Sequence, residues 1–293
     1  MGDRQVSTNW FDAVLSSREE LLPLATDVTP KLDKLSNLKA VIFDVYGTLV
    51  ISGSGDVGSA HESDSGDQIM EALDAVGIEI GAGRQPTIAD LHGEIRTANQ
   101  KRTSESCPKP EVDIVDVWRR TLIGCGLQSV TTEQSNRLAA EYESRANPTW
   151  PMPGAKKLLA DLSQTGRKLG IVSNAQEFTL PLVEDLDGHF GVDSVFETDL
   201  CVFSSRYRQA KPAPRLFDVL CDGLQRAGIA PGEAIYVGND RLNDVWAATQ
   251  AGLRTAWFAG DRRSLRARAE DPRVAKMDHD IILTHLGQLT ECI

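Results

Sequence analysis

The feature that most constrains the fold is a series of short apolar runs with helical stretches between them. These runs are AVIFD (40–44), KLGIVS (168–173), AIYVG (234–238), TAWF (255–258) and DIIL (280–283). Parallel strands must be joined by crossovers, which are usually helices, so this alternation is typical of a parallel sheet covered on both faces. The sequence therefore predicts an α/β fold.

A long interval without a convincing strand separates the first two apolar runs. Four stretches in it carry apolar residues at i, i+3 or i+4 spacing, which indicates amphipathic helices: 67–78, 86–102, 112–127 and 131–145. We predict an inserted helical domain over residues 53–148. A Gly/Ser/Asp-rich connector, 52–67, leads into it and is expected to act as a hinge, and the proline-rich segment 147–154 leads back.

The amino-terminal segment is predicted to be an appendage of the main domain. Residues 1–36 have apolar side chains at helical spacing, interrupted by Pro23, and predict a helical extension that packs on the body. The α/β core is then expected to comprise residues 37–52 and 149–293.

Composition excludes several classes of function. The chain has 293 residues and a net charge of −11, which argues against neutralisation of a nucleic-acid backbone. No apolar run approaches the roughly 20 residues that span a bilayer, and no signal peptide is evident, so we expect a cytoplasmic protein that binds neither membranes nor nucleic acid. The five cysteines are scattered without a C-x-x-C pattern, so no disulfide framework or zinc site is expected.

Polar and charged residues follow the apolar runs at the positions where parallel sheets bind their ligands. The carboxyl ends of parallel strands lie at one edge of a sheet, so side chains that follow different strands converge there. A lysine placed just ahead of a proline-rich helix start joins this set. The residues are Asp44, Ser173, Asn174, Lys211, Asp240 and Asp244.

Four short motifs in a fixed order carry a family resemblance. They are DVYGT (44–48), VSN (172–174), KP (211–212) and GNDRLND (238–244). In this order the chain resembles the haloacid dehalogenase (HAD) superfamily of hydrolases over residues 37 to about 260. The insertion between the first two motifs resembles the helical cap of subclass I. The resemblance implies a Rossmann-like parallel core with an inserted α-helical cap domain.

The resemblance also implies roles for individual residues. Asp44 would be the nucleophile that forms an aspartyl intermediate, which divides one difficult displacement into two easier steps. Lys211 would hold the transferred anionic group beside Asp44 by charge. Tyr46 occupies the position of the family's acid–base residue. The substrate-binding residues would be Thr48, Ser173, Asn174 and Lys211.

A magnesium ion is the cofactor that the resemblance implies. Its ligands would be Asp44, the carbonyl group of Tyr46, Asp240 and Asp244, since magnesium prefers oxygen ligands and a few carboxylates. Three carboxylates against the single charge of Lys211 leave about two negative charges, and such a cluster favours a divalent cation over an empty site.

Tyr46 departs from the pattern of most phosphatases in the superfamily, which have Asp at this position. A positioned general acid is worth about 10² to 10⁴ in rate, and a phenol is a poor base at neutral pH. The D-x-Y-G-T form resembles the haloacid dehalogenases, whose halide leaves without protonation. We favour a magnesium-dependent phosphatase for a small phosphorylated metabolite, restricted to weakly basic leaving groups. Two alternatives are a metal-independent 2-haloacid dehalogenase and a catalytically impaired protein that binds its small anionic ligand.

Overall fold

A six-stranded parallel sheet forms the centre of the molecule. The computed structural model describes residues 13–15, 18–54, 65–81, 83–127, 129–187 and 194–293. The strand order is β5-β4-β1-β6-β7-β8, and every neighbouring pair is parallel. The strands are β1 (Ala40–Phe43), β4 (Lys168–Ser173), β5 (Phe196–Phe203), β6 (Ala234–Gly238), β7 (Arg254–Phe258) and β8 (Ile281–Leu283). The predicted α/β fold is confirmed.

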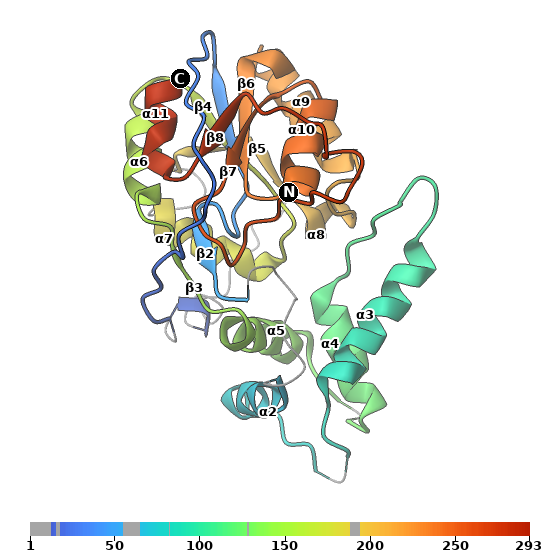
Figure 1. The fold of residues 1–293 in the computed structure, drawn as a ribbon. Coiled ribbons are helices and arrows are strands. Elements are labelled where there is room, and N and C mark those ends of the chain that lie inside the picture. The colour runs from blue at the N-terminus through green and yellow to red at the C-terminus, as the bar shows by residue number, and fades with distance from the viewer. Residues whose placement is uncertain (1–12, 16–17, 55–64, 82, 128, 188–193) are drawn as a thin grey trace.

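Helices cover both faces of this sheet (Figure 1). The alternating side chains of β1 show the two layers: Val41 and Phe43 belong to one apolar cluster, and Ala40 and Ile42 to another. The first cluster includes residues of α6 (Ala155–Ser163), α7 (Leu180–Asp187) and α11 (Leu289–Cys292), and the second includes residues of α9 (Arg215–Arg226) and α10 (Ala247–Gln250). Both faces of the central strand are therefore buried.

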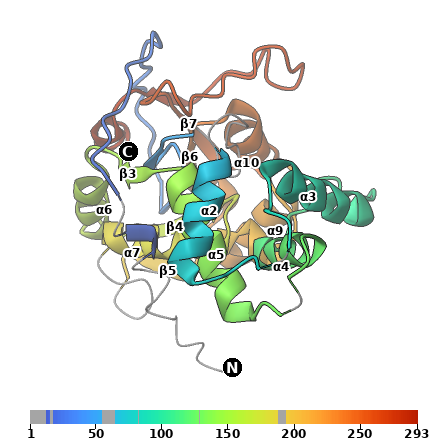
Figure 2. The same ribbon diagram turned by 90° about the horizontal axis from the view of Figure 1, so that it is seen from below.

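Four helices of the insertion lie together beyond the carboxyl ends of the strands. They are α2 (Ser65–Val76), α3 (Ile88–Arg102), α4 (Ile114–Gly124) and α5 (Thr132–Ala146), and we call them the cap. Figure 2, seen from below, shows α2 and α5 lying across the sheet, with α3 and α4 to one side. The helix starts follow the sequence locally: Thr131 caps α5 reciprocally with Gln134. All four helices predicted in the insertion are present.

A two-stranded antiparallel sheet joins the cap to the core. Val50, at the start of β2 (Val50–Ser52), pairs with Pro151, at the end of β3 (Thr149–Pro151). Residues 55–64, most of the predicted hinge, lie outside the described residues, so the hinge stays a prediction.

Two predicted features differ from the structure. The predicted helical extension over residues 1–36 is wrong for residues 18–36, which contain no helix: the chain there runs along the core, and Lys31 forms a bridge with Ile282. Strand β5 was not predicted because its exposed edge carries the polar run Glu197–Asp199, which obscures the apolar pattern. No helix among the described residues has the length and apolar character needed to cross a membrane.

Shorter helical turns complete the core: η1 (Glu177–Thr179), α8 (Ser204–Tyr207), η2 (Pro231–Glu233), the π-helical turn η3 (Arg241–Trp246) and η4 (Leu286–Gln288). Two of them, η1 and η3, follow strands β4 and β6 closely in the chain. They therefore contribute side chains to the same edge of the sheet.

Candidate active site

Lys211 is the centre of a buried network at the carboxyl ends of β1, β4 and β6. Its Nζ lies 2.9 Å from Asp44 Oδ1, 2.6 Å from Asp244 Oδ1 and 2.8 Å from the hydroxyl of Tyr236. The Tyr236 hydroxyl in turn donates to the carbonyl of Val172 at 2.6 Å. This network fixes the ammonium group between two carboxylates that are 200 residues apart in the chain.

The charges of the network keep Lys211 protonated. Burial acts to lower the pKa of Lys211, but the charges of Asp244 and Asp44 outweigh it, so the pKa of the lysine is raised. Lys211 is only 4% exposed, so water screens these interactions weakly. The lysine therefore provides a permanent positive charge beside Asp44.

A tight turn after β1 places Asp44 at this edge of the sheet. The N–H of Asp44 donates to the carbonyl of Val237 at 2.9 Å, which continues the pairing of β1 with β6. The turn requires Gly47, whose φ is +77° and whose missing Cβ would lie 2.5 Å from the side chain of Ser264. The glycine of the first motif therefore has a structural reason.

Tyr46 is buried, and its hydroxyl group is engaged away from the lysine network. The hydroxyl lies 2.9 Å from Thr179 Oγ1, on η1. Burial raises the pKa of Tyr46 well above its usual value, the nearby Glu143 carboxylate adds to this, and the bond with Thr179 acts against it. At neutral pH this side chain is a neutral phenol and not a base.

The four residues predicted to bind the substrate are placed differently from one another. Lys211 and Asn174 line a polar cavity together with Asp44. Asn174 also accepts a hydrogen bond from the main-chain N–H of Lys211 at 2.7 Å. Ser173 and Thr48 are not among the residues that line this cavity. The Thr48 hydroxyl donates to Asn239 at 3.3 Å, and the fully buried Ser173 Oγ has no hydrogen-bond partner among the described residues.

Asp240 lies in the same cavity, but its carboxylate is occupied by donors. Arg268 donates to its Oδ2 from Nη2 at 2.7 Å and from Nε at 3.1 Å. The main-chain N–H groups of Leu242 and Asn243 donate to its Oδ1 at 2.8 and 3.1 Å. Asp240 therefore caps the first turn of η3 and pairs with an arginine.

This arrangement bears on the predicted magnesium site. Asp44, Tyr46 and Asp244 line the cavity with oxygen atoms of the kind that a hard cation prefers. Asp244 already accepts from Lys211 Nζ at 2.6 Å and from the main-chain N–H of Asp240 at 2.8 Å. Asp240 does not fit as a fourth ligand while Arg268 holds it. Among the described residues, no three His, Cys, Asp or Glu side chains converge as a metal-binding group. The magnesium site stays a prediction, and it requires Arg268 to release Asp240 if that residue is to take part.

Two arginines also change the charge balance that the sequence suggested. Counted with Lys211, Arg268 on Asp240 and Arg266 in the cavity wall balance the charges of Asp44, Asp240 and Asp244, so the excess of two negative charges disappears. Sequence reasoning missed both arginines. The one signal that could have pointed to them is the basic run RRSLRAR (262–268). It also missed Tyr236 and Thr179, whose apolar or helical surroundings gave no indication of a role in the site.

The fold and the site define an α/β enzyme with a lysine–carboxylate cluster at the strand ends. A family model described as haloacid dehalogenase-like hydrolase matches residues 38–252, well over half of the chain. The chain therefore belongs to the haloacid dehalogenase-like hydrolases, as its motifs indicated. It is a hydrolase.

Curated relatives with phosphatase names are similar to parts of the chain. Glyceraldehyde 3-phosphate phosphatase of Pyrococcus furiosus is 28% identical over 48% of this chain and 54% of its own length. Phosphoglycolate phosphatase of Salmonella choleraesuis is 27% identical over 75% of this chain and 81% of its own. Phosphoserine phosphatase of Thermus thermophilus is 31% identical over 49% and 52%. The chain thus spans about half the length of the first and third of these relatives.

A solved structure shares the fold. The 2-haloacid dehalogenase from Pseudomonas syringae pv. Tomato DC3000 aligns with a TM-score of 0.55 and 18% identity, over 87% of this chain and 97% of the other. At this identity the likeness concerns the fold, and the substrate has to be argued from the side chains.

Proposed function

We propose that the protein is a phosphatase that hydrolyses small phosphorylated metabolites through an aspartyl-phosphate on Asp44. The observation that carries the proposal is the Asp44–Lys211 pair: the two side chains lie 2.9 Å apart in the wall of a polar cavity, so a nucleophile stands beside a fixed cation. The phosphatase names of the relatives support it.

Two displacements make up the proposed reaction. In the first, a carboxylate oxygen of Asp44 bonds to phosphorus, the ester P–O bond breaks and the leaving oxygen departs with the electron pair. In the second, water attacks the same phosphorus and the bond to Asp44 breaks, which regenerates the carboxylate and releases inorganic phosphate. The phosphate keeps the oxygen of the water, and the protons of the water pass to the phosphate and, through solvent, to the leaving oxygen. Lys211 holds the phosphoryl oxygens by charge throughout, and Asn174, which lines the same cavity, lies beside them. Magnesium, when bound by Asp44, Asp244 and the Tyr46 carbonyl, would neutralise phosphoryl charge.

This mechanism has no evident general acid to protonate the leaving group. The Tyr46 phenol is bonded to Thr179, and its raised pKa makes it a poor proton donor. We therefore expect weakly basic leaving groups, such as those of acyl, enol or aryl phosphates, to react fastest. A plot of log kcat/KM against leaving-group pKa should have a clear negative slope, and a flat line would contradict this expectation.

Hydrolysis of an aryl phosphate by the purified protein, with and without magnesium, tests the proposal directly. Asp44→Asn is the control, because it removes the nucleophile at almost constant volume. Release of phosphate that Asp44→Asn abolishes would support the mechanism. Equal release by the variant would show that Asp44 is not the nucleophile.

A second candidate is a metal-independent 2-haloacid dehalogenase. The pairing of Arg268 with Asp240, at 2.7 Å, favours it because an arginine then occupies one of the carboxylates that a metal ion would use. Halide has no need of a proton when it leaves, which also suits Tyr46. Halide release from 2-haloacids in EDTA, without phosphate release from any ester, would establish this candidate in place of the phosphatase.

A further inference from the structure

The cap contacts the core at a second place besides the β2–β3 sheet. The connector between α3 and α4 runs antiparallel to a core segment: the N–H of Glu111 donates to the carbonyl of Arg208 at 3.0 Å, and the N–H of Ala210 donates to the carbonyl of Lys109 at 2.8 Å. The two paired segments, which we call the cap–core ladder, are 109–111 and 208–210.

The ladder ends directly before Lys211. The carbonyl of Arg208 accepts a second hydrogen bond from the cap, from Arg102 Nη2 at 3.2 Å, and the Gln209 side chain donates to the carbonyl of Ser106 at 3.1 Å. Arg208 has a φ of +57°, a left-handed conformation that costs free energy for most residues other than glycine. The cap therefore supplies partners that stabilise this conformation just ahead of the lysine.

Glu111 of the cap fixes the ladder to the interior of the core. Its Oε2 accepts from the hydroxyl of the fully buried Ser204 at 2.6 Å, and its Oε1 accepts from Gln176 Nε2 at 3.0 Å. Ser204 begins α8, the turn that leads into Arg208, and Gln176 directly precedes η1. Gln176 also donates to the carbonyl of Val112 at 3.2 Å. One carboxylate of the cap thus joins the core segments that follow β4 and β5.

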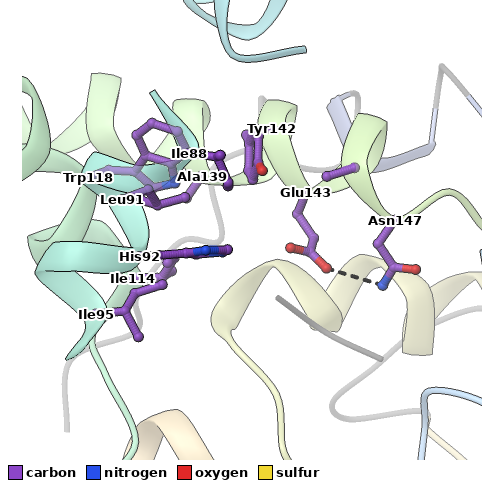
Figure 3. A pocket seen from close by; sticks show the side chains of 11 residues that line it. Ile88, Leu91, His92, Ile95, Ile114, Trp118, Ala139, Tyr142, Glu143 and Asn147 are labelled. Atoms are coloured by element: carbon purple, nitrogen blue, oxygen red, sulfur yellow. Dashed lines mark hydrogen bonds between the residues drawn. The ribbon is translucent and has the colours of Figure 1, made fainter. Parts of the chain in front are cut away.

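Inside the cap, by contrast, the packing of the helices is incomplete. A cavity of about 30 Å³, which we call the cap cavity, lies between α3, α4 and α5. Figure 3 shows Leu91 and Ile114 on one side of it and Glu143 across from them. Trp118 Nε1 and the Tyr142 hydroxyl, both in its wall, are buried without hydrogen-bond partners among the described residues. A void and unpaired donors weaken the packing of α4 on α5, so the contacts with the core help to hold α4.

We propose that the cap positions Lys211, and that Glu111 is the positioning residue. While Glu111 holds the ladder against the core, the main chain ahead of Lys211 is fixed and its Nζ stays 2.9 Å from Asp44 Oδ1. Without this carboxylate, residues 208–210 lose part of their support, and Lys211 is less often in place to hold a phosphoryl group. Docking of the cap and anion binding at Lys211 then stabilise each other. For its effect on turnover, the inference rests on the proposed phosphatase function.

Hydrogen–deuterium exchange and phosphate binding together test this role. Glu111→Ala should speed amide exchange of residues 208–211 at least about tenfold and raise the dissociation constant of inorganic phosphate, measured by calorimetry with magnesium, several-fold. Glu111→Gln keeps an acceptor for Gln176 and a group that bonds to Ser204, so both quantities should stay within about threefold of wild type. Glu105→Ala, at an exposed glutamate of the same connector, is the matched control and should change neither.

A variant on the core side separates a local role from a loss of overall stability. Ser204→Ala removes the O–H that bonds to Glu111, so it should also speed exchange in residues 208–211. In the double variant with Glu111→Ala, the two effects should not multiply, because both substitutions remove the same contact. Exchange that rises equally in the central strand β1, or not at all in residues 208–211, would overturn the inference.

The inference and the proposed function fail separately. Faster exchange of residues 208–211 in Glu111→Ala, in a protein that neither binds phosphate nor hydrolyses a phosphate ester, would refute the proposed function alone. Ester hydrolysis that Glu111→Ala leaves unchanged, with exchange in this segment also unchanged, would refute the inference alone.

Discussion

The site at the strand ends and the cavity in the cap use polar groups in opposite ways. At the strand ends Lys211 contacts two carboxylates and Asp240 is paired with Arg268, so the charges of the unliganded site are compensated by one another. In the cap cavity, Trp118 and Tyr142 are buried without hydrogen-bond partners among the described residues.

The difference is one between preorganised charge and unsatisfied donors. Groups that act on the phosphoryl or other transferred unit must be held in position before the substrate arrives, because catalysis depends on preorganised charge. Buried donors without partners, as in the cap, cost free energy in the folded chain until an acceptor pairs with them. The two regions can therefore be perturbed separately.

The largest expected effect comes from breaking the compensated network. Lys211→Met leaves Asp44 and Asp244 buried without their cation, so turnover should fall about 10² to 10³-fold, as when one stabilising donor is removed. The free energy of unfolding should fall by about 3–5 kcal/mol, because uncompensated buried charge remains. Turnover and urea unfolding measure the two effects. Lys157→Met, at a surface lysine of α6, should change neither. A folded Lys211→Met variant with near-normal turnover would show that the lysine is only structural.

A carboxylate at position 46, beside the nucleophile, tests how much turnover is lost because this position is a tyrosine. Tyr46→Asp should raise turnover of alkyl phosphates about 10²-fold, because a general acid then protonates the leaving oxygen. Aryl phosphates should gain much less. Tyr46→Phe is the control for loss of the phenol alone. A cooperative unfolding transition would show that the variant is folded. If a folded variant shows no gain in turnover of alkyl phosphates, position 46 does not face the leaving group.

Removal of the arginine that pairs with Asp240 tests whether Asp240 is a magnesium ligand. Arg268→Ala removes the bidentate partner of Asp240, so the magnesium concentration for half-maximal phosphatase activity should fall about tenfold. Arg262→Ala, at an exposed position of the same basic run, should leave it unchanged. An identical magnesium response in all three proteins would exclude Asp240 as a ligand.

The smallest effect is expected at the Tyr46–Thr179 pair, outside the lysine network. Thr179→Val removes the partner of the Tyr46 hydroxyl at almost constant volume, and an unpaired buried hydroxyl costs about 1–3 kcal/mol of stability. Turnover should change by less than about threefold if this hydroxyl takes no part in proton transfer. Chemical denaturation and aryl phosphate turnover provide the two measurements. A large loss of turnover at unchanged stability would instead place the Tyr46–Thr179 pair in the reaction.

Sequence by itself determined the parts of this protein that depend on local pattern. The apolar runs predicted β1, β4, β6, β7 and β8 nearly to the residue, and helical spacing predicted α2 to α5, because strand and helix periodicity are properties of neighbouring residues. Position after the strands was enough to bring Asp44 and Asp244 together, and the proline-rich helix start added Lys211 to them. Where several contacts with the core decide the conformation, as in residues 18–36, local spacing predicted the wrong structure.

Only the tertiary structure decided which groups these side chains meet. Tyr46 bonds to Thr179, 133 residues away, and Asp240 pairs with Arg268 from beyond the next strand of the chain. Trp118 and Glu143 reach one cavity from two helices. Such contacts depend on how the elements pack in three dimensions, and the spacing of apolar residues along the sequence does not determine that packing. Sequence motifs thus located the chemistry, and the packing of distant segments decided the partners of each group.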